Sequence, residues 1–248
     1  MERSVIVTGG SRGIGRTICL GAAKVGYQVC VNYAHNAEAA GEVISLIQAA
    51  GGTAIAVQAD MTKEADILRM FETVDRELAP LSALVNNAGI VDKASRVEDM
   101  SLERLERMFT TNITGPFLCA REAVKRLSTA HAGKGGVIVN ISSVAAKLGS
   151  PNEYVDYAAS KAAIDTMTMG LAKEVANEGI RVNAVRPGVI YTDIHASGGE
   201  PNRVDRVKSM VPMQRGGEAQ EIADAVLWLL SDQSSYVTGS LIDVSGGR

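Results

Sequence analysis

Thr8-Gly9-Gly10-Ser11-Arg12-Gly13-Ile14-Gly15 lies between an apolar β-branched run and a segment with helical periodicity. Glycines at these positions let the backbone turn tightly and approach a pyrophosphate, and the following helix offers free N–H groups and a positive dipole end. The spacing is Gly-x3-Gly-x-Gly, and glycine clusters also occur in ordinary turns. Its placement between a strand and a helix nevertheless predicts a dinucleotide site.

Outward from this loop, short β-branched runs alternate with longer helical patterns. The expected strands are Ser4–Thr8, Gln28–Tyr33, Ala54–Gln58, Ala83–Asn86, Val137–Ser142, Arg181–Arg186 and Leu241–Val244. Expected helices include Gly15–Val25, Glu38–Ala50, Lys63–Ala79, Leu102–Phe109, Tyr157–Asn177 and Ala219–Leu230. Strict alternation predicts a doubly wound α/β fold of the Rossmann type, with a seven-stranded parallel sheet flanked by helices. We expect a single domain over residues 1–248.

Composition narrows the class of protein. Hydrophobic residues make up 46% of the chain and charged residues 21%, and the formal net charge is −3. The sequence has no stripe of basic residues of the kind that indicates nucleic-acid binding. No apolar run approaches the roughly 20 residues of a membrane span, and no signal peptide is recognisable. Three scattered cysteines, Cys19, Cys30 and Cys119, are typical of reduced core residues. We therefore expect a cytoplasmic protein that binds neither nucleic acid nor membrane.

One long irregular stretch, residues 190–217, follows the sixth expected strand. Long loops in compact domains are usually functional, and doubly wound folds bind ligands at the carboxyl ends of their strands. We interpret this stretch as a flap that covers the substrate and contains a short helix. A plain surface insertion is the alternative.

The end of the second strand bears on the choice of nicotinamide cofactor. Enzymes that use NAD usually place Asp or Glu here to bind the ribose 2′-hydroxyl, whereas this chain has no acid from the end of that strand until Glu38. A carboxylate would repel a 2′-phosphate, so its absence permits NADP, with positive charge available from Arg12 and His35. The pattern favours NADP and leaves NAD possible. Asn86-Asn87-Ala88-Gly89, after the fourth strand, fits either a close ligand approach or a simple turn.

Tyr157 and Lys161 are four residues apart at the start of a long helix, so they share one face. A phenol titrates near pH 10. A cation about 4 Å away is worth roughly 4 kcal/mol at an effective dielectric of about 20, enough to lower the phenol pKa by up to about 3. This pair alone is common on helix surfaces. Tyr154 lacks a lysine four residues on, so Tyr157 is the better proton donor.

In combination, the glycine loop, Asn-Asn-Ala-Gly, a serine before the tyrosine and Tyr-x3-Lys resemble the short-chain dehydrogenase/reductase family over essentially the whole chain. The resemblance implies an NAD(P)-dependent enzyme acting on CH–OH groups, with no metal. It implies four catalytic residues: Asn112, Ser143, Tyr157 and Lys161. The residues that it implies for cofactor binding are Gly9, Ser11, Arg12, Gly13, Ile14, Gly15, Tyr33, Asp60, Met61, Asn86, Ala88, Gly89, Tyr157, Lys161, Pro187, Gly188, Ile190 and Thr192.

The roles implied are specific. Ser143 would bond the substrate oxygen, Tyr157 would donate or accept the proton, and Lys161 would bind the nicotinamide ribose. Asn112 would hold a water that connects Lys161 to solvent. Ser142 is the rival of Ser143, because adjacent residues at a strand end point in opposite directions.

The sequence motifs do not identify the substrate. The chain is similar to bacterial 3-oxoacyl-carrier-protein reductases and to sugar dehydrogenases of the glucose type. The polar stretch 194–203 favours a small polar alcohol or ketone such as a sugar. Lys134 and Lys147 leave an acidic carrier protein possible, while Glu178 opposes it. A non-catalytic dinucleotide sensor is a remote alternative, since the chain keeps the Tyr/Lys pair. The C-terminal segment from Ser235 resembles that of homotetrameric members.

Overall fold

The seven expected strands form one parallel sheet in a computed structural model, which describes residues 2–248. The strand order is β3-β2-β1-β4-β5-β6-β7, so the chain winds outward in both directions from β1 and β4. Every observed boundary lies within two residues of its expectation. The strands are β1 Arg3–Val7, β2 Tyr27–Tyr33, β3 Ala54–Gln58, β4 Leu81–Asn86, β5 Gly136–Ile141, β6 Ile180–Pro187 and β7 Leu241–Val244.

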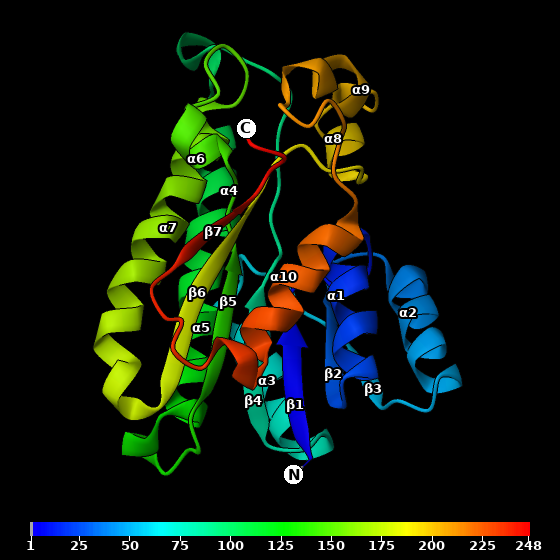
Figure 1. The fold of residues 1–248 in the computed structure, drawn as a ribbon, viewed down its shortest axis with the longest axis vertical. Coiled ribbons are helices and arrows are strands. Elements are labelled where there is room, and N and C mark those ends of the chain that lie inside the picture. Colours follow the sequence, from blue (N-terminus) through cyan, green and yellow to red (C-terminus); the bar gives the residue numbers. More distant parts are fainter. Residues whose placement is uncertain (1) are drawn as a thin grey trace.

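Helices connect the strands and cover both faces of the sheet (Figure 1). All six expected helices are present, with ends shifted by at most two residues. The main helices are α1 Gly13–Lys24, α2 Ala37–Ala49, α3 Glu64–Glu77, α4 Leu102–Phe109, α5 Gly115–Leu127, α7 Val155–Val175 and α10 Ala219–Leu230. Shorter ones are α6 Ala145–Leu148, α8 Ile194–Ser197 and α9 Arg203–Val207.

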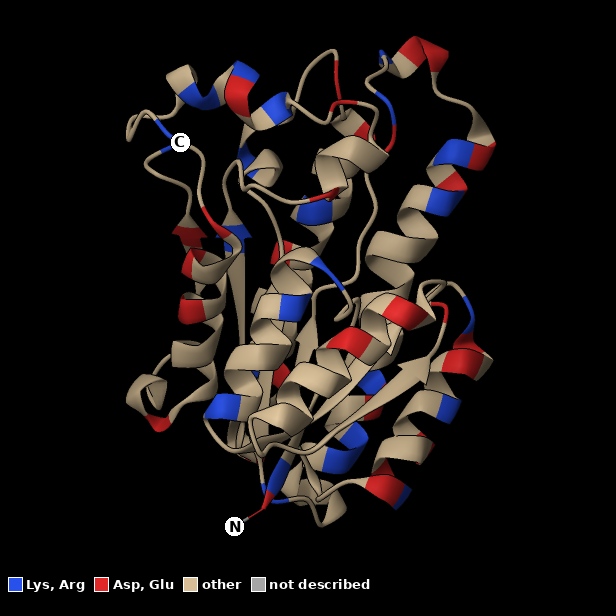
Figure 2. Ribbon diagram, turned by 90° about the vertical axis from the view of Figure 1, so that its right-hand side faces the viewer, with Lys and Arg blue, Asp and Glu red and all other residues tan. Residues whose placement is uncertain are grey.

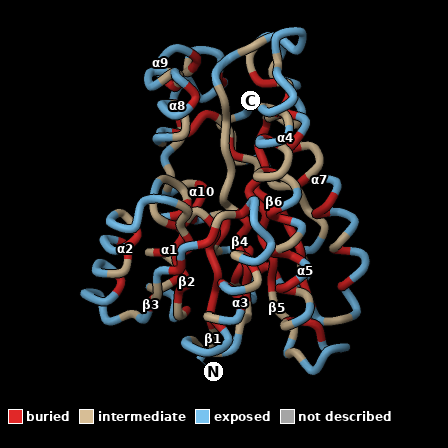
Figure 3. Tube along the Cα trace, turned by 180° about the vertical axis from the view of Figure 1, so that it is seen from behind, coloured by how far each residue is buried: buried red, intermediate tan, exposed pale blue. Residues whose placement is uncertain are grey.

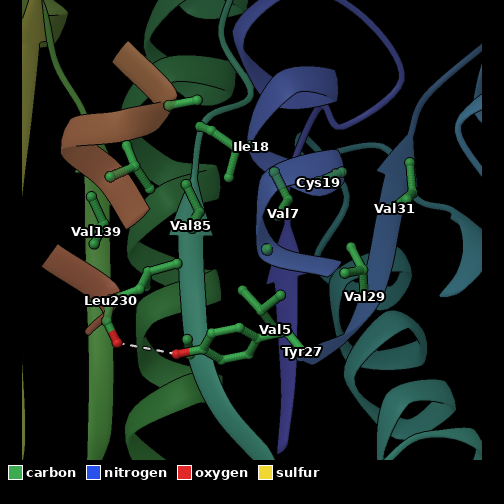
Figure 4. Close-up of a cluster of buried hydrophobic side chains, with 14 of the residues drawn as sticks. Val5, Val7, Ile18, Cys19, Tyr27, Val29, Val31, Val85, Val139 and Leu230 are labelled. Carbon is green, nitrogen blue, oxygen red and sulfur yellow. Dashed lines mark hydrogen bonds between the residues drawn. The ribbon is translucent and has the colours of Figure 1, made fainter. Parts of the chain in front are cut away.

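Side chains of each strand alternate between two hydrophobic cores. In β1, Val5 and Val7 enter the core shared with α1, α2 and α10, whereas Ile6 enters the opposite core with α3, α5 and α7. Figure 4 shows the first core, where the Tyr27 hydroxyl also donates a 3.1 Å hydrogen bond to the Leu230 carbonyl oxygen. Burial on both faces explains why the strands read as continuous apolar runs. Figure 3 shows the buried sheet between largely exposed outer helices.

The stretch 190–217 leaves the sheet after β6, and its two ends pair with each other. Ile190 and Gly217 form an isolated parallel bridge, with the Tyr191 N–H donating to the Gly217 carbonyl oxygen at 2.9 Å. Between these ends lie two short helices, α8 and α9, rather than the one helix expected. Both lie beyond the carboxyl ends of the strands (Figure 1). The predicted limits of this stretch therefore coincide with a closed loop.

Helices α4 and α5 are joined by a π-helical turn, Thr110–Thr114, without a break in the helical backbone. Asn112 lies in this turn and is fully buried. Single wide turns of this kind are frequent at functional sites. The turn therefore fixes the direction of the Asn112 side chain.

The surface carries both signs of charge interspersed, as Figure 2 shows. In residues 2–248 no helix is both long enough and apolar enough to cross a membrane. Cys19, Cys30 and Cys119 are buried and free, as expected of reduced core residues.

Candidate active site

A cleft of about 770 Å³ is lined by residues at the carboxyl ends of the strands and by residues of the stretch 190–217. It brings together most of the residues singled out from the sequence. The expected site residues that line it are Gly9, Ser11, Arg12, Gly13, Ile14, Gly15, Tyr33, Asp60, Met61, Ala88, Gly89, Ser143, Tyr157, Lys161, Pro187, Gly188, Ile190 and Thr192. Two expected residues, Asn86 and Asn112, do not line it.

The glycine loop is held in a shape that side chains would obstruct. Gly9 and Gly13 have φ of 62° and 52°, in the left-handed region that glycine tolerates best. A Cβ on Gly15 would overlap the carbonyl oxygen of Gly9. Asn32 fixes the loop from β2, since its Oδ1 accepts the Gly9 N–H at 3.0 Å. The result is a bare backbone cradle at the N-terminus of α1.

Asn86 corrects one expectation. It is in register with Asn140 on the neighbouring strand, and its Nδ2 donates to the Asn140 Oδ1 at 3.0 Å and to the Pro116 carbonyl oxygen at 3.3 Å. The Asn86 side chain therefore makes its hydrogen bonds inside the protein and does not face the cleft. Asn87 lines the cleft instead and donates to the carbonyl oxygens of Thr8 and Gly9 at 2.8 and 3.1 Å.

At the adenosine end, Tyr33, His35 and Asn36 follow β2 into the cleft, and Arg12 is exposed at its edge. No carboxylate occupies this strand end. Asp60, after β3, accepts hydrogen bonds at Oδ1 from the Thr62 N–H at 2.9 Å and from its hydroxyl at 2.8 Å. This end therefore combines a cation with polar side chains, as a phosphorylated ribose requires.

Tyr157 and Lys161 lie on the cleft side of α7. The Lys161 Nζ is 5.7 Å from the centroid of the Tyr157 ring and donates to the Ile141 carbonyl oxygen at 2.8 Å. Asn112 lies behind them: its Nδ2 donates to the Ser160 hydroxyl at 3.2 Å and to the Ile90 carbonyl oxygen at 2.9 Å. Asn112 therefore belongs to the layer that supports α7.

The serine pair is resolved by geometry. The Ser142 hydroxyl donates to the Lys161 carbonyl oxygen at 3.1 Å and is almost fully buried. The Ser143 hydroxyl accepts the Ala145 N–H at 3.1 Å and lies within hydrogen-bonding reach of Tyr157. Ser143 is therefore the serine beside the tyrosine, while Ser142 braces the helix.

Burial is the main influence on the pKa values of both Tyr157 and Lys161. It raises the pKa of Tyr157, against opposing contributions from the Ser143 hydrogen bond and from the charge of Arg203. Burial likewise lowers the pKa of Lys161 to about 8. The lowering of the Tyr157 pKa by Lys161 stays a prediction.

Comparison with known proteins identifies the family to which the chain belongs. Residues 9–248 match a protein-family model described as enoyl-(acyl carrier protein) reductase. An uncharacterized oxidoreductase of Escherichia coli K12, YgfF, is 61% identical over 98% of both chains. The chain belongs to the short-chain dehydrogenase/reductase family. It is an NAD(P)-dependent oxidoreductase of that family.

Other members of the family share the whole fold. The 3-oxoacyl-[acyl-carrier-protein] reductase FabG of Staphylococcus epidermidis is 36% identical, over 100% of this chain and 99% of its own. A crystal structure of a Burkholderia cenocepacia short-chain dehydrogenase in complex with NADP superposes with a TM-score of 0.90 at 32% identity. It covers 99% of this chain and 97% of that one.

Three residues of this short-chain dehydrogenase/reductase escaped the sequence analysis. Tyr154 lines the cleft, and the Arg203 guanidinium stacks on its ring 4.7 Å from the centroid. Arg203 comes from α9 of the flap and donates to Glu153 Oε2 at 2.6 Å. These residues are some 50 positions apart, so no local motif reveals them. The assignment of proton donation to Tyr157 rather than Tyr154 stays a prediction, and the Tyr154 side chain is part of the cleft wall.

Proposed function

We propose that the chain is an NADP(H)-dependent oxidoreductase for a small polar alcohol or ketone, sugars included. The observation that carries this proposal is the convergence of the glycine cradle with Ser143, Tyr157 and Lys161 in one cleft. The cradle fits a dinucleotide because side-chain atoms at Gly13 or Gly15 would fill it. Bound there, the cofactor supplies or takes up a hydride.

In this proposal the predicted cofactor-binding residues hold different parts of the dinucleotide. The glycine loop holds the phosphates, Arg12 faces the 2′-phosphate, and Asp60 meets the adenine. Pro187, Gly188, Ile190 and Thr192 flank the nicotinamide end, where the Thr192 side chain lies close to the space a Gly13 Cβ would fill. The absence of a carboxylate after β2 favours NADP over NAD.

Ser143 and Tyr157 bond the substrate oxygen, and Tyr157 delivers its hydroxyl proton to that oxygen in reduction or removes the proton in oxidation. Lys161 passes a replacement proton to Tyr157, and a water held by Asn112 would connect Lys161 to solvent. Burial raises the pKa of Tyr157, so the phenol is protonated at neutral pH. This state suits carbonyl reduction, and oxidation requires a more alkaline solution.

The test is the Tyr157→Phe variant, assayed with NADPH and NADP against sugars, alcohols, ketones and β-ketoacyl thioesters. We expect loss of turnover with NADPH affinity unchanged, measured by cofactor fluorescence. Turnover retained without the hydroxyl would exclude the assigned proton donor. A wild-type enzyme that binds NADPH and turns over none of the compounds would favour the sensor alternative.

A 3-oxoacyl-carrier-protein reductase is the second candidate, supported by the 36% identity to FabG of Staphylococcus epidermidis. An acidic carrier needs a basic docking surface. Lys147 is paired with Asp243, which offsets its charge. This pairing favours the small polar substrate over the carrier-bound one.

We further propose that the chain is one dinucleotide-binding domain, that residues 190–217 cover the substrate, and that the protein is a homotetramer. Phe117 on α5 and Met169 on α7 expose apolar side chains, which supports self-association through these helices. Light scattering tests the tetramer, and a monomer at micromolar concentration would contradict it.

A further inference from the structure

Arg203 is a buried cation in the wall of the cleft. Its side chain is 13% exposed, although it belongs to a short helix of the flap. Arginine is seldom so buried unless its donors are paired, because removing a charge from water is costly.

One side of the guanidinium is fully engaged, and the other is not. Nη2 donates to Glu153 Oε2 at 2.6 Å, and the plane stacks on Tyr154. Nη1 is buried and makes no hydrogen bond. The nearest carboxylate to Nη1 is Glu200, whose Oε2 lies 3.7 Å away. The Nη1 group of Arg203 thus has only the distant ion pair with Glu200 and no hydrogen-bond partner.

The neighbouring charges allow Nη1 to change partner at little cost. Arg206 pairs closely with Glu200 Oε2 and also reaches Glu153 Oε1 at 3.3 Å. Glu200 therefore stays paired when Nη1 turns to another oxyanion, and Glu153 keeps both arginines. Because Nη1 is covered by protein atoms, contact with a substrate requires a shift of the flap.

Three other basic side chains that line the cleft already have partners. Arg107 pairs with Asp92, and Lys161 donates to the Ile141 carbonyl oxygen. His195 lies 2.9 Å from the Ile190 carbonyl oxygen, and burial lowers its pKa, so the ring is neutral near pH 7. The field of Arg203 also reaches Tyr157, where it favours the phenolate.

We propose that Arg203 is the specificity-determining residue of this enzyme and binds a carboxylate on the substrate. A planar guanidinium with a free NH₂ group matches a carboxylate better than it matches a hydroxyl group. The substrate class is then the oxo acids and hydroxy acids, rather than neutral sugars or thioesters. This inference rests on the proposed function and narrows its substrate.

The test compares oxo acids with the methyl esters and primary amides of the same carbon skeleton, under NADPH. Wild type, Arg203→Gln, Arg203→Lys and Arg206→Gln are assayed side by side. Arg206 is the matched control, because it lies on the same helix and joins the same glutamates but does not line the cleft. NADPH affinity is measured for every variant.

We expect wild type to prefer acids. Arg203→Gln should lower kcat/KM for the acid roughly 100-fold, mainly through KM, and alter the ester less than about threefold. Arg203→Lys should retain part of the preference, and Arg206→Gln should change both substrates by a similar small factor. Equal losses on acid and ester, equal effects of the two glutamine variants, or a wild-type preference for esters would overturn the proposal.

The underlying function is judged separately. Turnover of neutral ketones or sugars that depends on Tyr157, without turnover of acids, would contradict only the role of Arg203. No turnover of any compound would contradict the proposed function itself.

Discussion

Arg104 of α4 and Asp156 of α7 form a buried two-point ion pair, with Nε–Oδ2 at 2.7 Å and Nη2–Oδ1 at 3.2 Å. The Asp156 side chain is fully buried, and its Oδ1 also accepts the backbone N–H of Tyr157 at 2.9 Å. Arg104 additionally donates to the Lys93 carbonyl oxygen at 2.7 Å. The first turn of the catalytic helix is therefore fastened to α4 and to the loop after β4.

Arg104→Met should destabilise the protein by about 3 kcal/mol or more, because it leaves the Asp156 charge buried without a partner. Urea unfolding followed by circular dichroism at fixed protein concentration measures this loss. Adding Asp156→Asn should recover over half of it, since an amide oxygen still accepts the Tyr157 N–H. Arg69→Met, which breaks the exposed pair with Asp66, is the control and should cost less than about 1 kcal/mol.

Lys161 should make stability rise with alkaline pH. The native state releases the Lys161 proton at about pH 8, because burial lowers its pKa. The unfolded chain releases it near pH 10.4, so it binds more protons between these values and the native state gains. Relative to Lys161→Met, the unfolding free energy of wild type should rise by about 1.6 kcal/mol from pH 8 to pH 9.5. A difference independent of pH would mean that Lys161 keeps its ordinary pKa.

Two glycine substitutions should have opposite effects. Gly15→Ala places a methyl group against the Gly9 carbonyl oxygen, so it should displace the cradle and abolish NADPH binding. Gly41→Ala, in exposed α2 with nothing within 4 Å, should stabilise the protein by about 0.5–1 kcal/mol. Cofactor fluorescence and thermal unfolding read out the two effects. Normal NADPH affinity in Gly15→Ala would contradict the cradle.

Arg12→Ala should weaken NADPH binding about tenfold and leave NADH binding nearly unchanged, since one charge-assisted hydrogen bond to the 2′-phosphate is lost. The difference should shrink at high salt, because Arg12 is exposed. Titrations of both cofactors at two ionic strengths provide the measurement. An equal loss for NADH would assign Arg12 to the shared pyrophosphate instead.

The sequence was a good guide to the fold because each strand is buried on both faces and each helix returns over the sheet. Val5, Ile6 and Val7 enter opposite cores yet are all apolar, so the run marks a central parallel strand. The motif residues could also be recognised from the sequence, because Gly9 to Gly15 and Tyr157 to Lys161 each lie within a short stretch of the chain. Local spacing was sufficient for these parts.

Contacts between segments that are distant in the sequence could not be predicted from local patterns. Asn86 and Asn87 are adjacent, and only the register of β4 with β5 decides that the first is buried. The pKa of Tyr157 depends on desolvation by everything packed around α7, and the spacing of residues along one helix does not encode that packing. Arg203 meets Glu153 only because the flap folds back over the cleft, and no periodicity encodes that path.

The π-helical turn at Thr110–Thr114 has a consequence for evolution and for engineering. One extra residue is taken up in this single wide turn, so α4 and α5 stay in phase along a continuous helical rod. Deleting one residue there would restore an ordinary α-helix and keep that phase. The wide turn that directs Asn112 toward Ser160 would then be lost. Length polymorphism should consequently be rarer at this turn than in the surface loops around it.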